Sequence, residues 1–323
     1  MSASFWQSER SCLVTGCGFV GSHLVDALLE AGARVRVVTR RRSPHRQHPH
    51  LEPIVADLGK PENCLRVVDG VECVFHAAGS VGAAGVGPIA AMAGIRLNLT
   101  LTANMLEAAW HAGVQRTLVF SSSTAYPVAN RPVGEDELWS GPVFPGYHGY
   151  GWMRRYIERL AEYVVATSGL GVAVVRPGAL YGPRDNFNPT TGHVVSSLIS
   201  RVVGGETPLQ VWGKGDDIRD FLHVRDFADG CLLALEHKAD GNGINVSSGT
   251  GVSTSDLARL ILRAAGRPES DLRFEPGRPT ALGYRVLDIS KARAELGFAP
   301  RISLKDGLAE TVAWYRSQDG EAS

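Results

Sequence analysis

Short apolar runs recur along the first 180 positions, and the segments between them carry apolar residues at helical spacing. Such amphipathic segments include FVGSHLVDALLEAG and LNLTLTANMLEAAWHAG. The apolar runs predict short buried strands over residues 11–16, 34–39, 51–56, 72–78, 116–122 and 171–177. Alternation of buried strands with amphipathic helices predicts an α/β fold, a doubly wound parallel sheet with helices on both faces.

The pattern changes after about residue 178, where loops rich in Gly and Pro separate shorter elements. We therefore expect two parts. Residues 1–178 would form the sheet domain, and residues 179–323 would mainly form a smaller lobe, with the chain returning to the sheet. Because doubly wound folds bind ligands at the carboxyl ends of their strands, we expect the lobe to lie over that edge.

Composition narrows the class of protein. The 33 basic and 33 acidic side chains cancel, so general attraction to nucleic acid or to a membrane surface is not expected. The N-terminus lacks the long apolar core of a signal peptide, and no apolar run reaches the roughly 18 residues of a membrane span. The five cysteines are scattered without C-x-x-C spacing, which indicates reduced thiols, no metal site and a cytoplasmic location.

A glycine motif follows the first expected strand. Gly16, Gly18 and Gly21 stand as G-x-G-x-x-G, with Phe19 and Val20 inside the motif at the start of a helix. Glycine at these positions permits a tight turn, close approach of a pyrophosphate, and close packing of helix on strand. The motif predicts a Rossmann-type dinucleotide site, and the alternative is a plain glycine-rich turn.

The end of the second expected strand bears on which dinucleotide binds. An NAD site usually places Asp or Glu there, but this chain has Thr39, Arg40 and Arg41. Guanidinium groups bind a 2′-phosphate that a carboxylate would repel. The sequence therefore favours NADP(H), with NAD(H) still possible, and the alternative interpretation is a solvated basic loop.

Four further residues follow neighbouring strands and are assigned to the same cofactor site. Asp57 would accept a hydrogen bond from the adenine amine, or it would simply cap the next helix. The others are Leu58, Ala77 and Ala78.

Hydroxyl side chains and a tyrosine indicate carbonyl chemistry. The segment TLVFSSSTAYP ends an expected strand in hydroxyls, and Tyr150 opens a helix about 28 residues later. A carbonyl reductase needs a proton donor and a second hydrogen bond at the substrate oxygen, which Tyr150 and a serine can supply. Arg154 lies one turn after Tyr150, on the same helix face. The alternative is an ordinary amphipathic helix.

At these residues the chain resembles the extended short-chain dehydrogenase/reductases that act on nucleotide sugars, and most of all the GDP-L-fucose synthase branch. The resemblance covers nearly the whole length. The segments that carry it are HAAGSVGAAGV (76–86), SSSTAYP (121–127), YGPRDNFNPTTGHVVSSLI (181–199), VWGKGDDIRDFLHVRDFA (211–228) and INVSSGTGVSTSDLA (244–258).

The resemblance implies roles for individual residues. Ser122 would be the hydrogen-bonding serine, with Ser123 the neighbouring candidate, and Tyr150 would be the proton donor. Arg154 would stand for the family's lysine and contact the nicotinamide ribose. His193 would be the acid or base of an epimerisation, which suits a group that titrates near neutral pH.

The resemblance also places substrate-binding residues in the second part of the chain. Arg201 and Arg219 would meet the diphosphate of the nucleotide, although either could be an ordinary surface salt-bridge partner. Asn186 and Trp212 belong to the same expected substrate set.

The chain departs from the family pattern at several positions. Arg154 replaces a lysine, Thr124 stands where the fucose-synthase branch has a catalytic cysteine, and Ala179 replaces an asparagine. The glycine loop is also one residue shorter than the usual one. Since threonine is a far poorer base than a thiolate, these departures place double epimerisation in question while leaving ketone reduction intact.

The resulting hypothesis is an NADP(H)-dependent 4-ketoreductase of a nucleotide-diphosphate 4-keto-sugar, alone or with an epimerisation step. One alternative is a redox-neutral, NAD-dependent nucleotide-sugar epimerase, and another is a catalytically impaired relative that binds nucleotides. The resemblance favours a GDP-sugar. It also favours a homodimer formed through the helices that contain LNLTLTANMLEAAW and RRYIERLAEYVV, although both could equally be core-facing helices.

Overall fold

A seven-stranded parallel sheet forms the centre of the computed structural model, which describes residues 3–6, 9–40, 46–80, 88–277 and 282–320. The strand order is β10-β6-β5-β4-β1-β2-β3, with all neighbours parallel. The strands are β1 (Ser11–Thr15), β2 (Arg34–Thr39), β3 (Leu51–Val55), β4 (Cys73–His76), β5 (Arg116–Phe120), β6 (Gly171–Pro177) and β10 (Asp240–Val246). The six predicted strands are all present, and the second half of the chain supplies the seventh.

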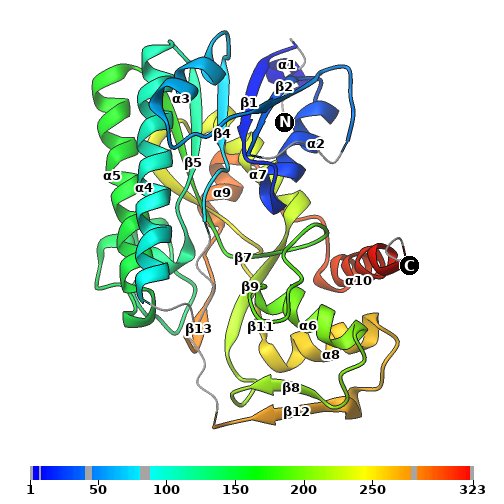
Figure 1. Ribbon diagram of the computed structural model, residues 1–323. Coiled ribbons are helices and arrows are strands. Elements are labelled where there is room, and N and C mark those ends of the chain that lie inside the picture. Colours follow the sequence, from blue (N-terminus) through cyan, green and yellow to red (C-terminus); the bar gives the residue numbers. More distant parts are fainter. Residues whose placement is uncertain (1–2, 7–8, 41–45, 81–87, 278–281, 321–323) are drawn as a thin grey trace.

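Helices cover both faces of this sheet (Figure 1). One face carries α3 (Pro61–Val68), α4 (Pro88–His111) and α5 (His148–Ser168). The other carries α2 (Phe19–Glu30) and α7 (Val224–His237), which pack against each other. Each layer buries its own apolar core, and the two cores are separated by the sheet. The predicted doubly wound α/β fold is therefore confirmed.

The smaller lobe is built from short strands and three helices among its described residues. In it β9 (Ile218–His223) pairs with β7 (Ala179–Tyr181), β11 (Gly251–Ser253) and β13 (Tyr284–Arg285), while β8 (Leu209–Trp212) pairs with β12 (Leu272–Glu275). A third apolar core lies beneath α6 (Val194–Val203), α8 (Thr254–Ala264) and α10 (Leu304–Gly320). The remaining helices are α1 (Ala3–Trp6), α9 (Ser290–Leu296) and four short 3₁₀ turns, Ser123–Ala125, Glu135–Trp139, Pro145–Tyr147 and Glu269–Asp271.

Two sequence predictions need correction. The strand predicted as buried at 51–56 is β3, the exposed edge of the sheet, where Glu52, Pro53 and Val55 face solvent. An edge tolerates proline because its missing N–H is not needed by a further strand. The prediction that no apolar run reaches membrane-span length is also wrong, as judged by length and composition. The helix segment Ile89–His111 has a mean hydropathy of 1.2 over a window of 18 residues.

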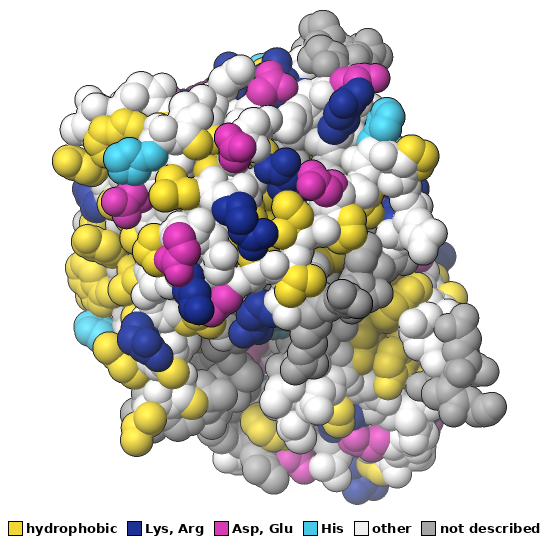
Figure 2. All heavy atoms as spheres, turned by 45° about the horizontal axis from the view of Figure 1, so that its top comes forward, with side chains coloured by type: hydrophobic (Ala, Val, Ile, Leu, Met, Phe, Trp, Pro, Cys, Tyr) yellow, Lys and Arg dark blue, Asp and Glu magenta, His cyan; other side chains and the backbone are white. Residues whose placement is uncertain are grey.

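That apolar helix is nevertheless part of the fold. In α4 the side chains of Leu101, Met105 and Leu106 are buried in the core that covers the sheet, and the helix packs against α3 and α5. Only 28% of the apolar window is buried, because the opposite face of the helix is also apolar and exposed. On the face drawn in Figure 2, basic and acidic side chains of the described residues are interspersed, in keeping with the zero net charge.

The topology fixes where a ligand can bind. Strand order reverses between β1 and β4, since the chain runs outward from β1 through β2 to β3 and then crosses back to β4. In open α/β sheets the crevice at such a reversal, at the carboxyl ends of the strands, is the ligand site. The glycine motif after β1 and the serine cluster after β5 both lie at this edge.

A buried histidine at the end of β9 makes stability depend on pH. His223 caps α7, with its Nδ1 accepting a bond from the N–H of Arg225, and its Nε2 is buried without a hydrogen-bond partner among the described residues. Burial and the nearby positive charge of Arg225 lower the pKa of His223 to about 3. Folding therefore holds this imidazole neutral.

Between pH 6.5 and about 3 the unfolded chain binds a proton on His223 and the folded chain does not. The contribution of His223 to the free energy of unfolding should therefore decrease as the pH falls through this window. In His223→Asn, which keeps a capping acceptor, this dependence is absent. We expect the difference in unfolding free energy between parent and variant to fall by about 1.4 kcal/mol per pH unit in that window. Urea unfolding of both proteins at several pH values measures it. A difference that does not change with pH would contradict a buried neutral imidazole. Burial raises the pKa of Asp220 to about 6, which has the opposite effect on the pH dependence of stability, but this effect is common to parent and variant and cancels in the comparison.

Candidate active site

The glycine turn after β1 leaves space where a pyrophosphate would lie. A Cβ on Gly21 would stand 2.0 Å from the carbonyl oxygen of Gly16, and Gly16 has φ +85°, so a side chain is excluded at both positions. A Cβ on Gly18, in contrast, would meet nothing within 4 Å. Gly18 is the N-cap of α2, and Phe19 and Val20 form its first turn. The first turn of a full-length helix is thus open to an anion, which fits a bound dinucleotide.

A cleft between β2, β3 and α3, the ribose cleft, lies where the sequence predicts the adenosine ribose. Arg40, Asp57, Asn63 and Arg66 line it, together with Val55 and Ala56. Arg40 directly follows Thr39 at the end of β2, as the sequence predicts, whereas Arg41 lies outside the described residues. Arg66 was not predicted, because a basic residue on an exposed helix carries no signal of its own. The cleft combines two guanidinium groups and one carboxylate.

Asp57 does not cap α3. The N-cap of that helix is Lys60, and the Asp57 carboxylate instead accepts a bond from the N–H of Gly59 at 3.0 Å. Its role toward adenine stays a prediction. Leu58 is buried beside it, and Ala77 and Ala78 follow β4 against the glycine turn, where the Ala78 Cα lies 3.2 Å from the Cβ position of Gly16.

Tyr150 and Arg154 form the contact that their spacing predicts. An Nη2 hydrogen of Arg154 is donated to the Tyr150 hydroxyl over 2.6 Å, and Nη1 donates to the carbonyl of Phe120, the last residue of β5, over 2.8 Å. The guanidinium also lies over the tyrosine ring, 4.9 Å from its centroid. Because Arg154 donates to the phenol oxygen, the hydrogen of the Tyr150 hydroxyl is left to be donated to another acceptor.

Ser122 is arranged as a hydrogen-bond donor. Its Oγ accepts two bonds from Thr124, one from the backbone N–H at 3.2 Å and one from the hydroxyl at 2.9 Å. With both lone pairs used, the Ser122 hydroxyl hydrogen is left to donate elsewhere. Thr124 therefore orients Ser122, while Ser123 lies in the 3₁₀ turn that Ser122 caps.

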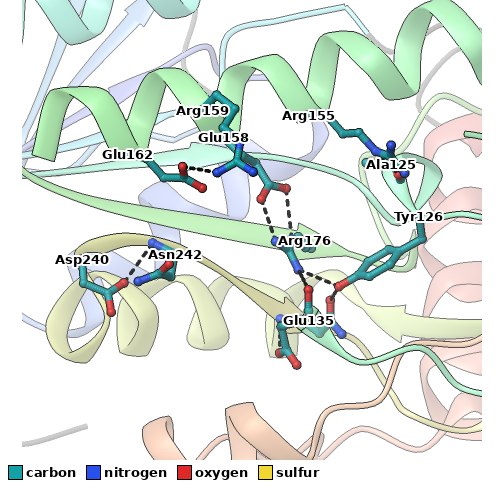
Figure 3. Close-up of polar contacts among 11 residues, drawn as sticks. Ala125, Tyr126, Glu135, Arg155, Glu158, Arg159, Glu162, Arg176, Asp240 and Asn242 are labelled. Atoms are coloured by element: carbon teal, nitrogen blue, oxygen red, sulfur yellow. Dashed lines mark hydrogen bonds and ion pairs between the residues drawn. The ribbon is translucent and has the colours of Figure 1, made fainter. Parts of the chain in front are cut away.

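A buried ion pair holds the catalytic helix against the sheet (Figure 3). Glu158, one turn beyond Arg154 on α5, accepts two bonds from Arg176 of β6, at 3.0 and 2.7 Å. Arg176 also donates to the Tyr126 hydroxyl at 2.8 Å, and Tyr126 lies four residues after Ser122. These buried contacts connect helix α5, which carries Tyr150, with the segment that follows Ser122.

His76, at the end of β4, was missed by sequence reasoning. The Thr15 hydroxyl accepts a bond from the N–H of Ala78 and shares a second hydrogen bond with His76 Nδ1 over 3.0 Å. The other ring nitrogen, Nε2, is buried without a described partner. Burial and the positive charge of Arg154 lower the pKa of His76 to about 4. A neutral imidazole therefore lies at the point where strand order reverses.

His193 lies in the smaller lobe and caps α6. Its hydrogen-bond partner among the described residues is Asp185, with 3.2 Å between His193 Nδ1 and Asp185 Oδ1. The structure thus brings Ser122, Thr124, Tyr150 and Arg154 together as two contacting pairs, and it gives His193 a carboxylate partner that the sequence did not predict.

Arg219 lies beside a second arginine. It is paired in register with Arg285 across β9 and β13, and its Nη1 donates to the backbone carbonyl of the neighbouring residue Ile218 over 2.8 Å. Arg285 is 5% exposed, its Nε has no described partner, and burial and the charge of Arg219 lower its pKa to about 10. Two adjacent guanidinium groups, one of them with an unmet donor, are suited to a diphosphate.

The other predicted substrate residues have different surroundings. Arg201 makes a two-point ion pair with Glu206, at 2.7 and 2.6 Å, so the salt-bridge alternative describes its geometry. Asn186 is exposed and donates to Thr191 within the loop before α6. Trp212 is 54% exposed at the end of β8. Contact of these three with a substrate stays a prediction.

Known proteins share both this sequence pattern and this fold. Residues 12–247 match the model of the NAD dependent epimerase/dehydratase family. A dTDP-4-dehydro-6-deoxy-D-allose reductase of Streptomyces bikiniensis is 32% identical over 98% of this chain and 99% of its own length. The probable GDP-L-fucose synthase 1 of Oryza sativa subsp. japonica is 34% identical over 68% of this chain and 69% of its own length.

A solved structure agrees with these sequence matches. The dTDP-glucose 4,6-dehydratase DesIV of Streptomyces venezuelae, crystallised as a double mutant with NAD bound, superimposes with a TM-score of 0.84. It is 26% identical and covers 97% of this chain and 98% of its own. The predicted family is confirmed: this chain is an enzyme of the NAD dependent epimerase/dehydratase family, one of the extended short-chain dehydrogenase/reductases that act on nucleotide sugars.

Proposed function

We propose that this enzyme is an NADPH-dependent reductase of a nucleotide-diphosphate 4-keto-6-deoxy-sugar. The observation that carries the proposal is the pairing of Tyr150 with Arg154 beside a donor-oriented Ser122, at the sheet edge where the glycine turn opens. This arrangement supplies a proton and a hydrogen bond to one carbonyl oxygen.

The protein's own part in the reaction follows from these contacts. NADPH, when bound along the glycine turn, supplies the hydride that reduces the carbonyl carbon. Ser122 donates a hydrogen bond to the carbonyl oxygen and holds it in place. Tyr150 gives its proton to that oxygen as negative charge develops there, and Arg154 stabilises the tyrosinate that remains.

The ribose cleft supports NADPH over NADH. Arg40 and Arg66 both line it, and the residue that ends β2 is Thr39 rather than an acid. Guanidinium groups form charge-assisted bonds to a 2′-phosphate. The solved relative DesIV holds NAD, so the preference of this enzyme for NADPH is a property to be measured.

Replacing Arg40 with Ala is expected to weaken NADPH binding by about 10- to 100-fold, because one charge-assisted bond contributes about 1.5–3 kcal/mol. NADH binding should change little, since NADH lacks the 2′-phosphate. Calorimetric titration of both cofactors measures the two effects separately, and Arg34→Ala, an exposed arginine at the opposite end of β2, is the matched control. Equal losses for both cofactors would contradict a 2′-phosphate contact at Arg40.

The full-length relative and the arginine pair support a choice of sugar nucleotide for this proposal. The reductase from Streptomyces acts on a dTDP-sugar, and the relatives named as GDP-L-fucose synthases match about two thirds of the chain. Arg219 and Arg285 suit the diphosphate that both nucleotides share. We therefore place a dTDP-4-keto-6-deoxy-sugar first and the GDP-sugar of the original hypothesis second.

An epimerisation step would need a base beside the carbonyl. His193 is the candidate, and Thr124 is not, because its hydroxyl is committed to Ser122. A single histidine supports exchange at one adjacent carbon, whereas two opposed groups are needed to invert a centre efficiently.

Identification of the cofactor tests the proposal first. The purified enzyme should release no tightly bound NAD on denaturation, and NADPH should raise its melting temperature more than NADH does. Stoichiometric NAD in the purified protein, with no effect of NADPH, would instead support the redox-neutral epimerase.

For the assembly we propose a homodimer through α4 and α5. The outer face of α5 exposes Trp152, Tyr156 and Tyr163, and α4 exposes Met92 beside it. An apolar surface of this kind favours a partner surface. Light scattering after size-exclusion chromatography should give twice the chain's 34.6 kDa, and a mass of one chain would contradict the dimer.

A further inference from the structure

The loop between β7 and α6 carries His193, and one buried side chain in it has no assigned role. We propose that Asp185 is the positioning residue for His193, holding its Nδ1 so that Nε2 is the nitrogen that exchanges a proton with the substrate. This inference rests on the proposed function of the same site.

The geometry of the pair carries the inference. The Asp185 side chain is 2% exposed, whereas that of His193 is 48% exposed. Asp185 Oδ1 lies 3.2 Å from His193 Nδ1 and accepts the N–H of Asn186 at 2.7 Å. Asp185 Oδ2 is buried without a described hydrogen-bond partner. A buried carboxylate with so few hydrogen bonds destabilises the folded protein unless a polar or charged neighbour compensates its charge. His193 is that neighbour.

Two opposing charges act on the imidazole. His193 caps α6, and the positive end of a helix disfavours a positive imidazole. The hydrogen bond that His193 donates to Asp185 nevertheless raises the pKa of His193, so the carboxylate outweighs the effect of burial. With Nδ1–H donated to Asp185, the Nε2 lone pair is free to accept a proton, and the protonated ring can return it.

The backbone around Asp185 is held in an unusual conformation. Arg184, a non-glycine residue, has φ +68°. It donates to Asp26 of α2 over 2.7 Å, and Asp26 also receives a bond from Arg46. A left-handed conformation is unfavourable for a non-glycine residue and persists only where its surroundings hold it. The contact with Asp26 holds the Arg184 side chain against α2, the helix that follows the glycine turn. The side chain of Asp185 is left in contact with His193.

The test compares the full-length enzyme with Asp185→Asn by NMR titration of the histidine rings, with His193→Asn to assign the His193 signals. In the parent the neutral ring should carry its proton on Nδ1. In Asp185→Asn the pKa of His193 should fall, and the neutral ring should be a mixture of the Nδ1–H and Nε2–H tautomers. Asp185→Glu keeps a carboxylate and should retain part of the raised pKa. An unchanged pKa and tautomer in Asp185→Asn would overturn the proposal.

A second measurement connects the pair to catalysis. dTDP-4-dehydro-6-deoxy-D-allose and GDP-4-keto-6-deoxymannose are incubated with enzyme in deuterium oxide without NADPH. Uptake beside the carbonyl should be about 10- to 100-fold slower in Asp185→Asn, by analogy with the hydrogen-bond partners of metal-bound histidines, with ketone reduction retained. Unchanged uptake would overturn the positioning role.

The failure of the proposed function looks different. If the parent itself takes up no deuterium, epimerisation at this site fails, but the NMR titration still decides whether Asp185 holds His193. Glu107→Gln serves as the control, because it removes an exposed carboxylate 3.9 Å from another histidine, His111, and should leave both readouts unchanged.

Discussion

Tyr150→Phe is expected to slow carbonyl reduction by about 10²- to 10⁴-fold, the usual contribution of a positioned general acid. The variant loses the hydroxyl that Arg154 contacts at 2.6 Å and keeps the ring beneath the guanidinium. Helix α5 should therefore stay folded, and the cofactor should still bind along the glycine turn. Single-turnover kinetics with NADPH and the keto-sugar nucleotide measure the chemical step directly.

The same helix supplies a matched control. Tyr163 is 58% exposed on α5, and Tyr163→Phe removes a hydroxyl with no expected effect on rate. Arg154→Lys keeps a cation near Tyr150 and should preserve reduction. A Tyr150→Phe enzyme with nearly full activity would mean that another group protonates the oxygen, which would remove the central residue of the proposed mechanism.

Removing the charge of Glu158 is expected to destabilise the protein by about 3–5 kcal/mol, because Arg176 would remain buried without its counter-charge. The two side chains are 2% and 5% exposed, so water cannot replace the lost partner. Glu158→Gln keeps the size of the side chain and changes the charge alone. Urea unfolding of parent and variant gives the difference.

Figure 3 also shows the control for this change. Arg159 and Glu162 form an ion pair on the same helix, but their side chains are 53% and 37% exposed. Glu162→Gln should cost no more than about 0.5 kcal/mol, because exposed pairs contribute little. Similar losses for both variants would show that the buried pair does not hold α5 in place.

Periodicity was sufficient to predict the central sheet and the helices that cover it. All six predicted strands form: five are largely buried between the helix layers and pair on both sides within the sheet, and β3 is its exposed edge. The glycine turn and the contact between Tyr150 and Arg154 were also predictable, since both depend on spacing within a single element.

Contacts between distant segments could not be read from spacing. Asp185 and His193 are joined by a loop, and Arg219 meets Arg285 only because β9 and β13 pair. Arg66 joins Arg40 through the packing of α3 beside β2 and β3. The exposure of β3 was missed for a related reason: composition does not show which side of an element the fold leaves uncovered.

The central claim is tested most directly by mixing the enzyme with dTDP-4-dehydro-6-deoxy-D-allose and NADPH and following cofactor oxidation together with the sugar product. The account expects one NADPH to be oxidised for each 4-keto group reduced, with the GDP-4-keto sugar as the comparison substrate. Conversion of either sugar without net NADPH oxidation, by enzyme that carries bound NAD, would contradict it.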